Sequence, residues 1–148
     1  MTTLPAEVHA VFDGKEFVTL CTLLPDGSPH LTVLWVARDG DDILLSSVEG
    51  RQNAKALARD HRATVLLSPQ GHPYSYVEVR GTTTLTHDGA RELIDALHEK
   101  YHGTRPYPYD TKGEVRVLIR LTPTKVVVRD IARAVAGRDP STAGTPNL

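Results

Sequence analysis

The chain has 148 residues, 17 of them basic and 18 acidic, and a net charge of −1. This length predicts one domain with a core large enough to fold without disulfide bonds, and the single cysteine, Cys21, has no partner for one. The near-zero charge argues against general attraction to nucleic acid or to an anionic membrane surface. No apolar stretch is long enough to cross a membrane and the first residues lack the features of a signal peptide, so we expect a cytoplasmic protein.

The first part of the chain predicts a short helix followed by three strands joined by tight turns. The turn sequences are Pro25-Asp26-Gly27 and Asp39-Gly40-Asp41-Asp42, which carry the residues that turns require. Between them the chain is apolar or alternates, as strands do. The three strands are expected to form an antiparallel meander. The expected elements are a helix over residues 5–12 and strands over 16–24, 29–37 and 43–48.

The second part of the chain predicts three more strand regions and a longer helix. Gly81 marks a bend or bulge in the longest of these strands. Asp88 is placed to cap the helix that follows, and Pro123 is expected to interrupt the last strand region. The expected elements are strands over 63–68 and 74–87, a helix over 89–102 and a strand region over 115–129.

The many short strands and few helices predict a mainly β protein, a small β-barrel with peripheral helices at its rim. From Asp130 onward the composition turns to Ala, Gly, Pro, Ser and Thr, with only a short helix at 131–135 as a further element. We therefore expect a folded domain over residues 1–130 and a flexible C-terminal tail over 131–148.

The most informative segment is the start of the helix that follows the third strand. Acidic side chains are favoured in the first turn of a helix, whereas this helix begins with Arg51 and Lys55, one turn apart. With Ser46 and Ser47 at the end of the preceding strand, these cations predict a site for a phosphate or carboxylate. The alternative, which the spacing alone slightly favours, is an ordinary solvated stripe that also includes Arg59.

The sequence lacks the patterns of several common catalytic sites. The nearest approach to a metal-binding pattern is His98 and His102, one helical turn apart, so we expect no metal. There is no nucleophile elbow, phosphate-binding loop or dinucleotide glycine triplet. These absences favour a pocket in which a bound cofactor performs the reaction.

Four segments, each a weak motif alone, occur in the order that one protein family shows. The chain resembles the FMN-binding split β-barrel proteins related to pyridoxamine 5′-phosphate oxidase, in particular their deazaflavin branch, which uses coenzyme F-420. The resemblance covers nearly the whole domain and is carried by residues 23–30, 45–55, 76–81 and 119–126.

The resemblance implies a split barrel of six to seven antiparallel strands and a homodimer with two equivalent cofactor sites at the subunit interface. The cofactor ring would lie along the second strand, its phosphate would lie at the cationic helix, and Tyr76 would be a contact from the partner side. The residues implied in cofactor binding are Thr32, Val33 and Leu34 at the ring, and Ser46, Ser47, Arg51 and Lys55 at the phosphate.

Three positions depart from the family pattern. His30 stands where the oxidases have an arginine near the phosphate, which predicts a weaker and pH-dependent contact. Asn53 stands where many relatives have a second cation, so the phosphate site loses a charge. The segment from Asp130 to Leu148 has neither the Trp nor the His of the oxidases' substrate clamp, which argues against vitamin B6 oxidation.

The function that these features imply is hydride transfer between reduced coenzyme F-420 and an unidentified small organic molecule. Tyr76, Ser47 or solvent could supply the accompanying proton, and no spacing identifies a catalytic residue. Two alternatives stay open: an FMN-dependent oxidase or reductase on the same fold, and a non-catalytic protein that carries the cofactor.

Two aromatic features have both a structural and a functional interpretation. For Trp35 on the second strand, packing in the core or in a dimer interface is the favoured interpretation, and stacking on a cofactor is the alternative. The segment over 101–109, rich in aromatic residues and proline, predicts either an ordered loop over the barrel mouth or a loop that gates substrate.

Overall fold

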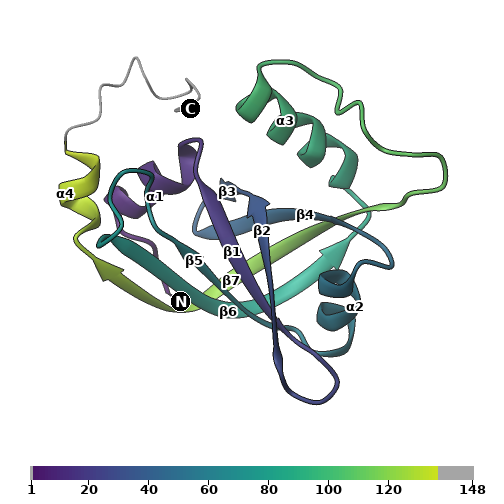
Figure 1. Cartoon of the computed structure of the whole chain (residues 1–148), viewed down its shortest axis with the longest axis horizontal. Helices are drawn as coiled ribbons and strands as arrows, with labels where there is room; N and C mark the ends of the chain where they lie inside the picture. Colours follow the sequence, from purple (N-terminus) through teal and green to yellow (C-terminus); the bar gives the residue numbers. More distant parts are fainter. Residues whose placement is uncertain (1, 137–148) are drawn as a thin grey trace.

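A computed structural model describes residues 2–136 of the chain. Within these residues, seven strands form one antiparallel sheet and four helices lie around it (Figure 1). The elements are α1 (Ala6–Asp13), β1 (Phe17–Leu23), β2 (Pro29–Trp35), β3 (Ala37–Asp39), β4 (Asp42–Val48), α2 (Gln52–Arg59), β5 (Arg62–Leu67), β6 (Tyr76–Thr86), α3 (Ala90–His102), β7 (Arg116–Arg129) and α4 (Ile131–Val135). The mainly β class with peripheral helices is confirmed.

The sheet curls into a half-open barrel. Its strand order is β2-β1-β5-β6-β7-β4-β3, so that β2 lies at one edge and β3 at the other. The curl brings β2 close to β4, although the two strands are not hydrogen-bonded to each other (Figure 1). This is the split barrel expected from the sequence, with its opening along β2.

The predicted meander of three strands is wrong, because the chain leaves the sheet after β2. Val36 donates its backbone N–H to the Tyr101 hydroxyl at 3.1 Å, and its carbonyl oxygen accepts a hydrogen bond from Lys100 Nζ at 2.7 Å. Both backbone groups of Val36 are thus bonded by side chains of α3 instead of a neighbouring strand. The chain then crosses to the opposite edge, where β4 pairs with β3 and β7.

The long antiparallel pair β6–β7 contains the predicted irregularity at Gly81. The register shifts between Arg80 and Gly81, and a Cβ at Gly81 would lie 2.1 Å from the carbonyl oxygen of Thr122. Pro123 pairs with Gly81 at this bulge, where its missing N–H is tolerated. The predicted interruption of the last strand is therefore wrong, since β7 continues through Pro123.

The helices cover the barrel and complete its core. The α3 helix starts after Gly89, whose φ is +78°, and no side chain caps it, so the predicted cap by Asp88 is wrong. Ile131 of α4 is 1% exposed and packs in the main core, and α4 contacts α1. The packed domain thus extends past the expected boundary at residue 130. The rest of the predicted tail, residues 137–148, lies outside the described residues.

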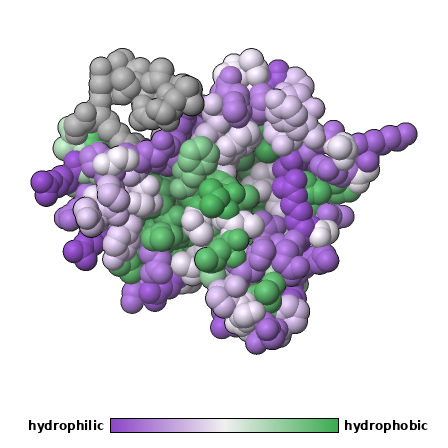
Figure 2. Space-filling view, in the orientation of Figure 1, coloured by the Kyte–Doolittle hydropathy of each residue, from purple (hydrophilic) through white to green (hydrophobic). Residues whose placement is uncertain are grey.

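One outer face of the sheet is apolar and exposed. Phe17, Leu31, Val33 and Leu66 are 47%, 61%, 68% and 45% exposed. The pairing of Thr19 with both Val33 and Leu66 places these side chains on one face of β1, β2 and β5. Figure 2 shows hydrophobic residues gathered at the centre of this view, over these strands. We call these four side chains the outer apolar patch.

No helix among residues 2–136 is long and apolar enough to span a membrane.

Candidate functional site

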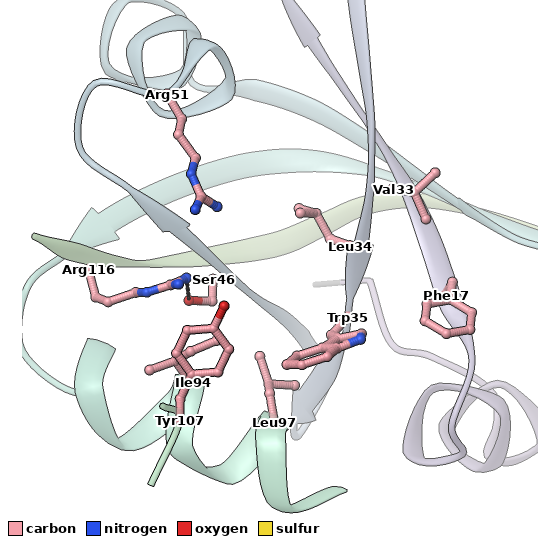
Figure 3. Close-up of a pocket in the computed structure, with 10 residues that line it drawn as sticks. All are labelled: Phe17, Val33, Leu34, Trp35, Ser46, Arg51, Ile94, Leu97, Tyr107 and Arg116. Carbon is pink, nitrogen blue, oxygen red and sulfur yellow. Dashed lines mark hydrogen bonds between the residues drawn. The ribbon is translucent and has the colours of Figure 1, made fainter. Parts of the chain in front are cut away.

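A cavity of about 310 Å³ lies at the opening of the barrel, between β2, the β4–α2 junction and α3 (Figure 3). One wall is apolar and aromatic, and is formed by Phe17, Val33, Leu34 and Trp35. Val33 and Leu34 point to opposite faces of β2, yet both reach the cavity because β2 is the edge strand. Arg51 lies on the opposite side, and the third wall is formed by α3, the connection that follows it, Ser46 and Arg116.

Arg51 points into this cavity from the start of α2 (Figure 3). Its side chain makes no hydrogen bond or ion pair within the part of the chain that the structure describes. Gly50, with a φ of +90°, forms the tight turn that places Arg51 there. A guanidinium that faces a cavity and is not paired with a carboxylate is suited to bind an anionic group of a ligand.

Lys55 does not join Arg51, which corrects the predicted cluster of the two cations. Arg51 precedes the first helical residue and has an extended backbone, with φ −67° and ψ 152°, so the rule for residues one helical turn apart does not apply to it. Lys55 instead lines a second cavity of about 340 Å³, beside Glu49 and His87. These two residues are hydrogen-bonded to each other.

The two serines at the end of β4 are also separated, because consecutive residues of a strand point to opposite faces. Ser46 lines the cavity. Ser47 is fully buried and donates a hydrogen bond to Asn53 Oδ1 at 2.6 Å, and Asn53 Nδ2 donates to Thr32 Oγ1 at 3.4 Å. Ser47, Asn53 and Thr32 therefore tie β4, α2 and β2 together and do not line the cavity.

The structure brings four of the predicted site residues together at the cavity: Val33, Leu34, Ser46 and Arg51. His30 and Tyr76 are half-buried on β2 and β6 and lie outside the cavity lining. The predicted residues that the structure does not place in the lining are His30, Thr32, Ser47, Asn53, Lys55 and Tyr76.

Trp35 both packs and lines the cavity. Its ring stacks on Tyr101 with centroids 5.0 Å apart and an interplanar angle of 10°. The Tyr101 hydroxyl donates to the carbonyl oxygen of Glu16 and accepts from Val36, and burial raises the pKa of Tyr101 to about 12. The indole is thus held by a rigid support while it faces the cavity.

Lys100, next to Tyr101 on α3, supports the same region from the other side. Its Nζ donates to the carbonyl oxygens of Phe12 at 2.9 Å and Val36 at 2.7 Å. Burial lowers the pKa of Lys100 to about 8, because the ammonium is removed from water. The helix α3 is therefore bonded by charged and polar side chains to the segments that flank β1 and β2.

Sequence reasoning missed much of the third wall. Tyr107 lay within a segment that was recognised as unusual, but no spacing distinguished it from its aromatic neighbours. Arg116, Ile94 and Leu97 gave no signal, since an arginine before an apolar strand and leucine-type residues on a helix are common. Within residues 2–136 there is no group of three or more potential metal ligands.

The site therefore combines a flat apolar and aromatic surface, hydroxyl groups, and Arg51, which is unpaired within residues 2–136. Such a combination can hold a planar conjugated molecule that carries an anionic group at one end.

Comparisons with known proteins agree with this geometry. A family model described as pyridoxamine 5′-phosphate oxidase matches residues 4–130. A pyridoxine/pyridoxamine 5′-phosphate oxidase of Kineococcus radiotolerans is 30% identical over 130 residues, which are 88% of this chain and 54% of that protein. The chain thus spans about half the length of this curated relative.

Two solved structures are similar over most of the chain. An F-420 reductase aligns with a TM-score of 0.74 and 25% identity, over 84% of this chain and 98% of its own. A pyridoxamine 5′-phosphate oxidase-related, FMN-binding protein of Nostoc punctiforme aligns with a TM-score of 0.60 and 17% identity, over 85% of this chain and 84% of its own.

Proposed function

Because the chain belongs to the pyridoxamine 5′-phosphate oxidase family, we propose that it is an oxidoreductase that transfers a hydride between reduced coenzyme F-420 and an unidentified small organic molecule. The family is one of flavin-binding oxidoreductases with the split-barrel fold. The similarity to an F-420 reductase, which aligns over 98% of its own length, supports the deazaflavin as the cofactor.

The observation that carries this proposal is the guanidinium of Arg51, which faces the cavity without a partner in the described part of the chain. A flavin-type nucleotide combines a flat conjugated ring with a phosphate. The surface formed by Val33, Leu34 and Trp35 suits the ring, and Arg51 suits the phosphate. The residues present therefore fit a flavin or deazaflavin.

The coenzyme supplies the hydride when it is bound. The protein has to bind the coenzyme, orient it toward the substrate and exclude water from the site. Arg51 would hold the anionic end, and the apolar wall would hold the ring and keep it dry. Ser47, one of the proton donors considered from the sequence, donates its proton to Asn53 and is fully buried, so it is not a candidate.

A side-by-side fluorescence titration of the purified protein with F-420 and with FMN tests the proposal. We expect saturable binding of both, with F-420 the tighter. Reoxidation of reduced F-420 by a panel of conjugated enones then measures turnover. If neither F-420 nor FMN shows saturable binding, the proposal is contradicted.

FMN is the second candidate cofactor, because the chain shares its fold with the FMN-binding Nostoc protein. The missing cation at Asn53 does not count against FMN here, since that side chain is 4% exposed and bonded within the fold. Tight binding of FMN with weak binding of F-420 would favour this alternative. Binding of F-420 with no turnover of any acceptor would favour a cofactor carrier.

We also propose that two copies pair through the outer apolar patch. Large apolar side chains exposed together on one sheet face are typical of an association surface. The seven residues of β2 include none that is buried in the single chain, although β2 forms a wall of the cavity. In such a homodimer His30 and Tyr76 are the residues that we expect to approach the partner's cofactor site.

A further inference from the structure

Arg116, at the start of β7, has a side chain that is only 8% exposed. Its Nε and Nη2 donate to the carboxylate of Asp110 at distances of 2.6 to 3.0 Å. Such a bidentate ion pair fixes the plane of the guanidinium and offsets the free-energy cost of removing its charge from water. The charge of Arg116 is therefore neutralised by Asp110, whereas Arg51 has no carboxylate partner among residues 2–136.

The rest of the guanidinium faces two residues of the cavity. Nη1 of Arg116 donates to Ser46 Oγ at 3.2 Å, and the guanidinium carbon lies 4.8 Å from the centre of the Tyr107 ring. Figure 3 shows these three side chains together on one wall, with the Tyr107 hydroxyl directed into the cavity. Because Ser46 accepts this hydrogen bond, its own proton can be donated to a ligand.

The backbone of Tyr107 is fixed by α3. Its N–H donates to Asp95 Oδ1 at 2.8 Å, and its carbonyl oxygen accepts from Arg91 Nη2 at 2.9 Å. Arg91 Nη1 also donates to Asp110 at 2.9 Å, so one carboxylate joins α3 to β7. The Tyr107 ring stands edge-on to Trp35 at 6.3 Å. The connection between α3 and β7 is thus a supported wall and not a free gate.

We infer that Arg116 is a positioning residue of the proposed site. It holds Ser46 and Tyr107 so that both hydroxyl groups face the ligand, and it leaves Arg51 as the cation that binds the ligand's anionic group. Two hydroxyl donors on one wall suit a substrate with a conjugated carbonyl oxygen, which gains negative charge as the carbon accepts hydride. The identity of the ligand rests on the proposed function. The contacts of Arg116 with Ser46, Tyr107 and Asp110 are present in the protein without a ligand.

The test compares Arg116→Gln, Asp110→Asn and Arg51→Gln in the full chain. Trp35 is the single tryptophan, so its emission reports the contact with Tyr107. Hydrogen exchange of residues 103–115 reports the wall, and titration with F-420 and FMN reports binding.

We expect Arg116→Gln and Asp110→Asn to behave alike. In both, exchange in 103–115 rises by roughly tenfold or more, Trp35 emission changes, and affinity for the ligand falls. Arg51→Gln leaves exchange and emission as in the wild type and lowers the affinity only. The two variants of the pair change the charge in opposite directions, so a purely electrostatic role would give opposite effects on affinity.

A result in which Asp110→Asn tightens binding, Arg116→Gln weakens it, and exchange stays unchanged would overturn the inference and make Arg116 a direct ligand of the anion. If either single variant fails to fold, the double variant Arg116→Gln/Asp110→Asn replaces it, because it leaves no buried unpaired charge. We expect faster hydrogen exchange of residues 103–115 in this double variant. Exchange at the wild-type rate would contradict the inference. If the wild type binds neither coenzyme, the proposed function fails, while exchange and Trp35 emission still decide the role of Arg116.

Discussion

The β6–β7 pair and the edge strand β2 differ in what holds them in place. The pair extends from Tyr76 opposite Arg129 to Thr86 opposite Leu118, with the bulge at Gly81, and it places fully buried residues such as Val77 and Ile119 in the core. In contrast, β2 pairs on one side only and has no buried residue. Its free side forms the cavity wall and its outer face contributes to the outer apolar patch.

This difference separates stability from binding. The β6–β7 half carries the core and fixes the barrel, so changes there should alter the free energy of unfolding. Around β2, apolar side chains are exposed and Arg51 has no partner among the described residues, so changes there should alter association and ligand affinity.

Gly81→Ala is expected to lower the free energy of unfolding by about 3 kcal/mol, because its Cβ would clash with the Thr122 carbonyl. Gly27→Ala, in the β1–β2 turn, is the matched control. Its φ is +86° but nothing lies within 4 Å, so it should cost about 1 kcal/mol. Urea unfolding measures both, and equal losses would contradict the assigned difference between the two halves.

Leu31→Asp is expected to weaken self-association by roughly 30-fold or more, because a charge would be buried in the proposed interface. Val115→Asp, also exposed but off the patch at 43% exposure, is the control and should have no such effect. Sedimentation over a concentration series measures the association. A wild type that stays monomeric at all concentrations would contradict the proposed dimer.

The pH dependence of stability tests the support of β2 by α3. The pKa of Lys100 is lowered in the fold, so the unfolded chain binds more protons between pH 8 and 10.5, and stability should rise with pH there, by on the order of 1 kcal/mol. The pKa of Tyr101 is raised, so its contribution is full below pH 10 and is lost as the pH rises toward 12. Stability should therefore peak between pH 9 and 10.5.

Lys100→Met should remove the rising limb of this profile and keep the falling limb. Urea unfolding at pH 7, 8, 9, 10 and 11 distinguishes the two limbs. An unchanged rise in the Lys100→Met variant would show that another group causes it.

Thr22→Val is expected to raise the free energy of unfolding by about 0.5 to 1 kcal/mol, because the Thr22 hydroxyl is fully buried and has no hydrogen-bond partner within the described part of the chain. The same substitution at Thr83 should lower it by about 1 kcal/mol, since that hydroxyl donates to the His61 carbonyl at 2.9 Å. Thermal unfolding in parallel compares the signs. Two losses of equal size would indicate an acceptor for Thr22.

Local patterns recovered most of the elements, because turns and strand alternation depend on neighbouring residues. The Pro25-Asp26-Gly27 turn does join a hairpin, and Gly81 does lie at a bulge. The strand order was not accessible in the same way. The break at Val36 depends on Tyr101 and Lys100, which are distant in sequence.

The candidate site shows the same limit. Arg51 and Ser46 could be proposed from the sequence because a cation at a helix start is unusual and hydroxyl residues precede it, although the spacing alone slightly favoured a solvated stripe. Lys55 was grouped with Arg51 by a rule that holds only inside a helix, and Arg51 lies just before it. Arg116 was missed because its role arises from Asp110 and Tyr107, which the fold brings to it.

The most direct test of the account is titration of F-420 into Arg51→Gln and, as the matched control, Lys55→Gln. Each substitution removes one positive charge, at the residue before α2 or within α2, but only Arg51 lines the cavity at β2, whereas Lys55 lines the second cavity. We predict an affinity loss of about tenfold or more for Arg51→Gln and less than about twofold for Lys55→Gln. Equal losses in the two variants, or a larger loss for Lys55→Gln, would contradict the placement of the ligand's anionic end at Arg51.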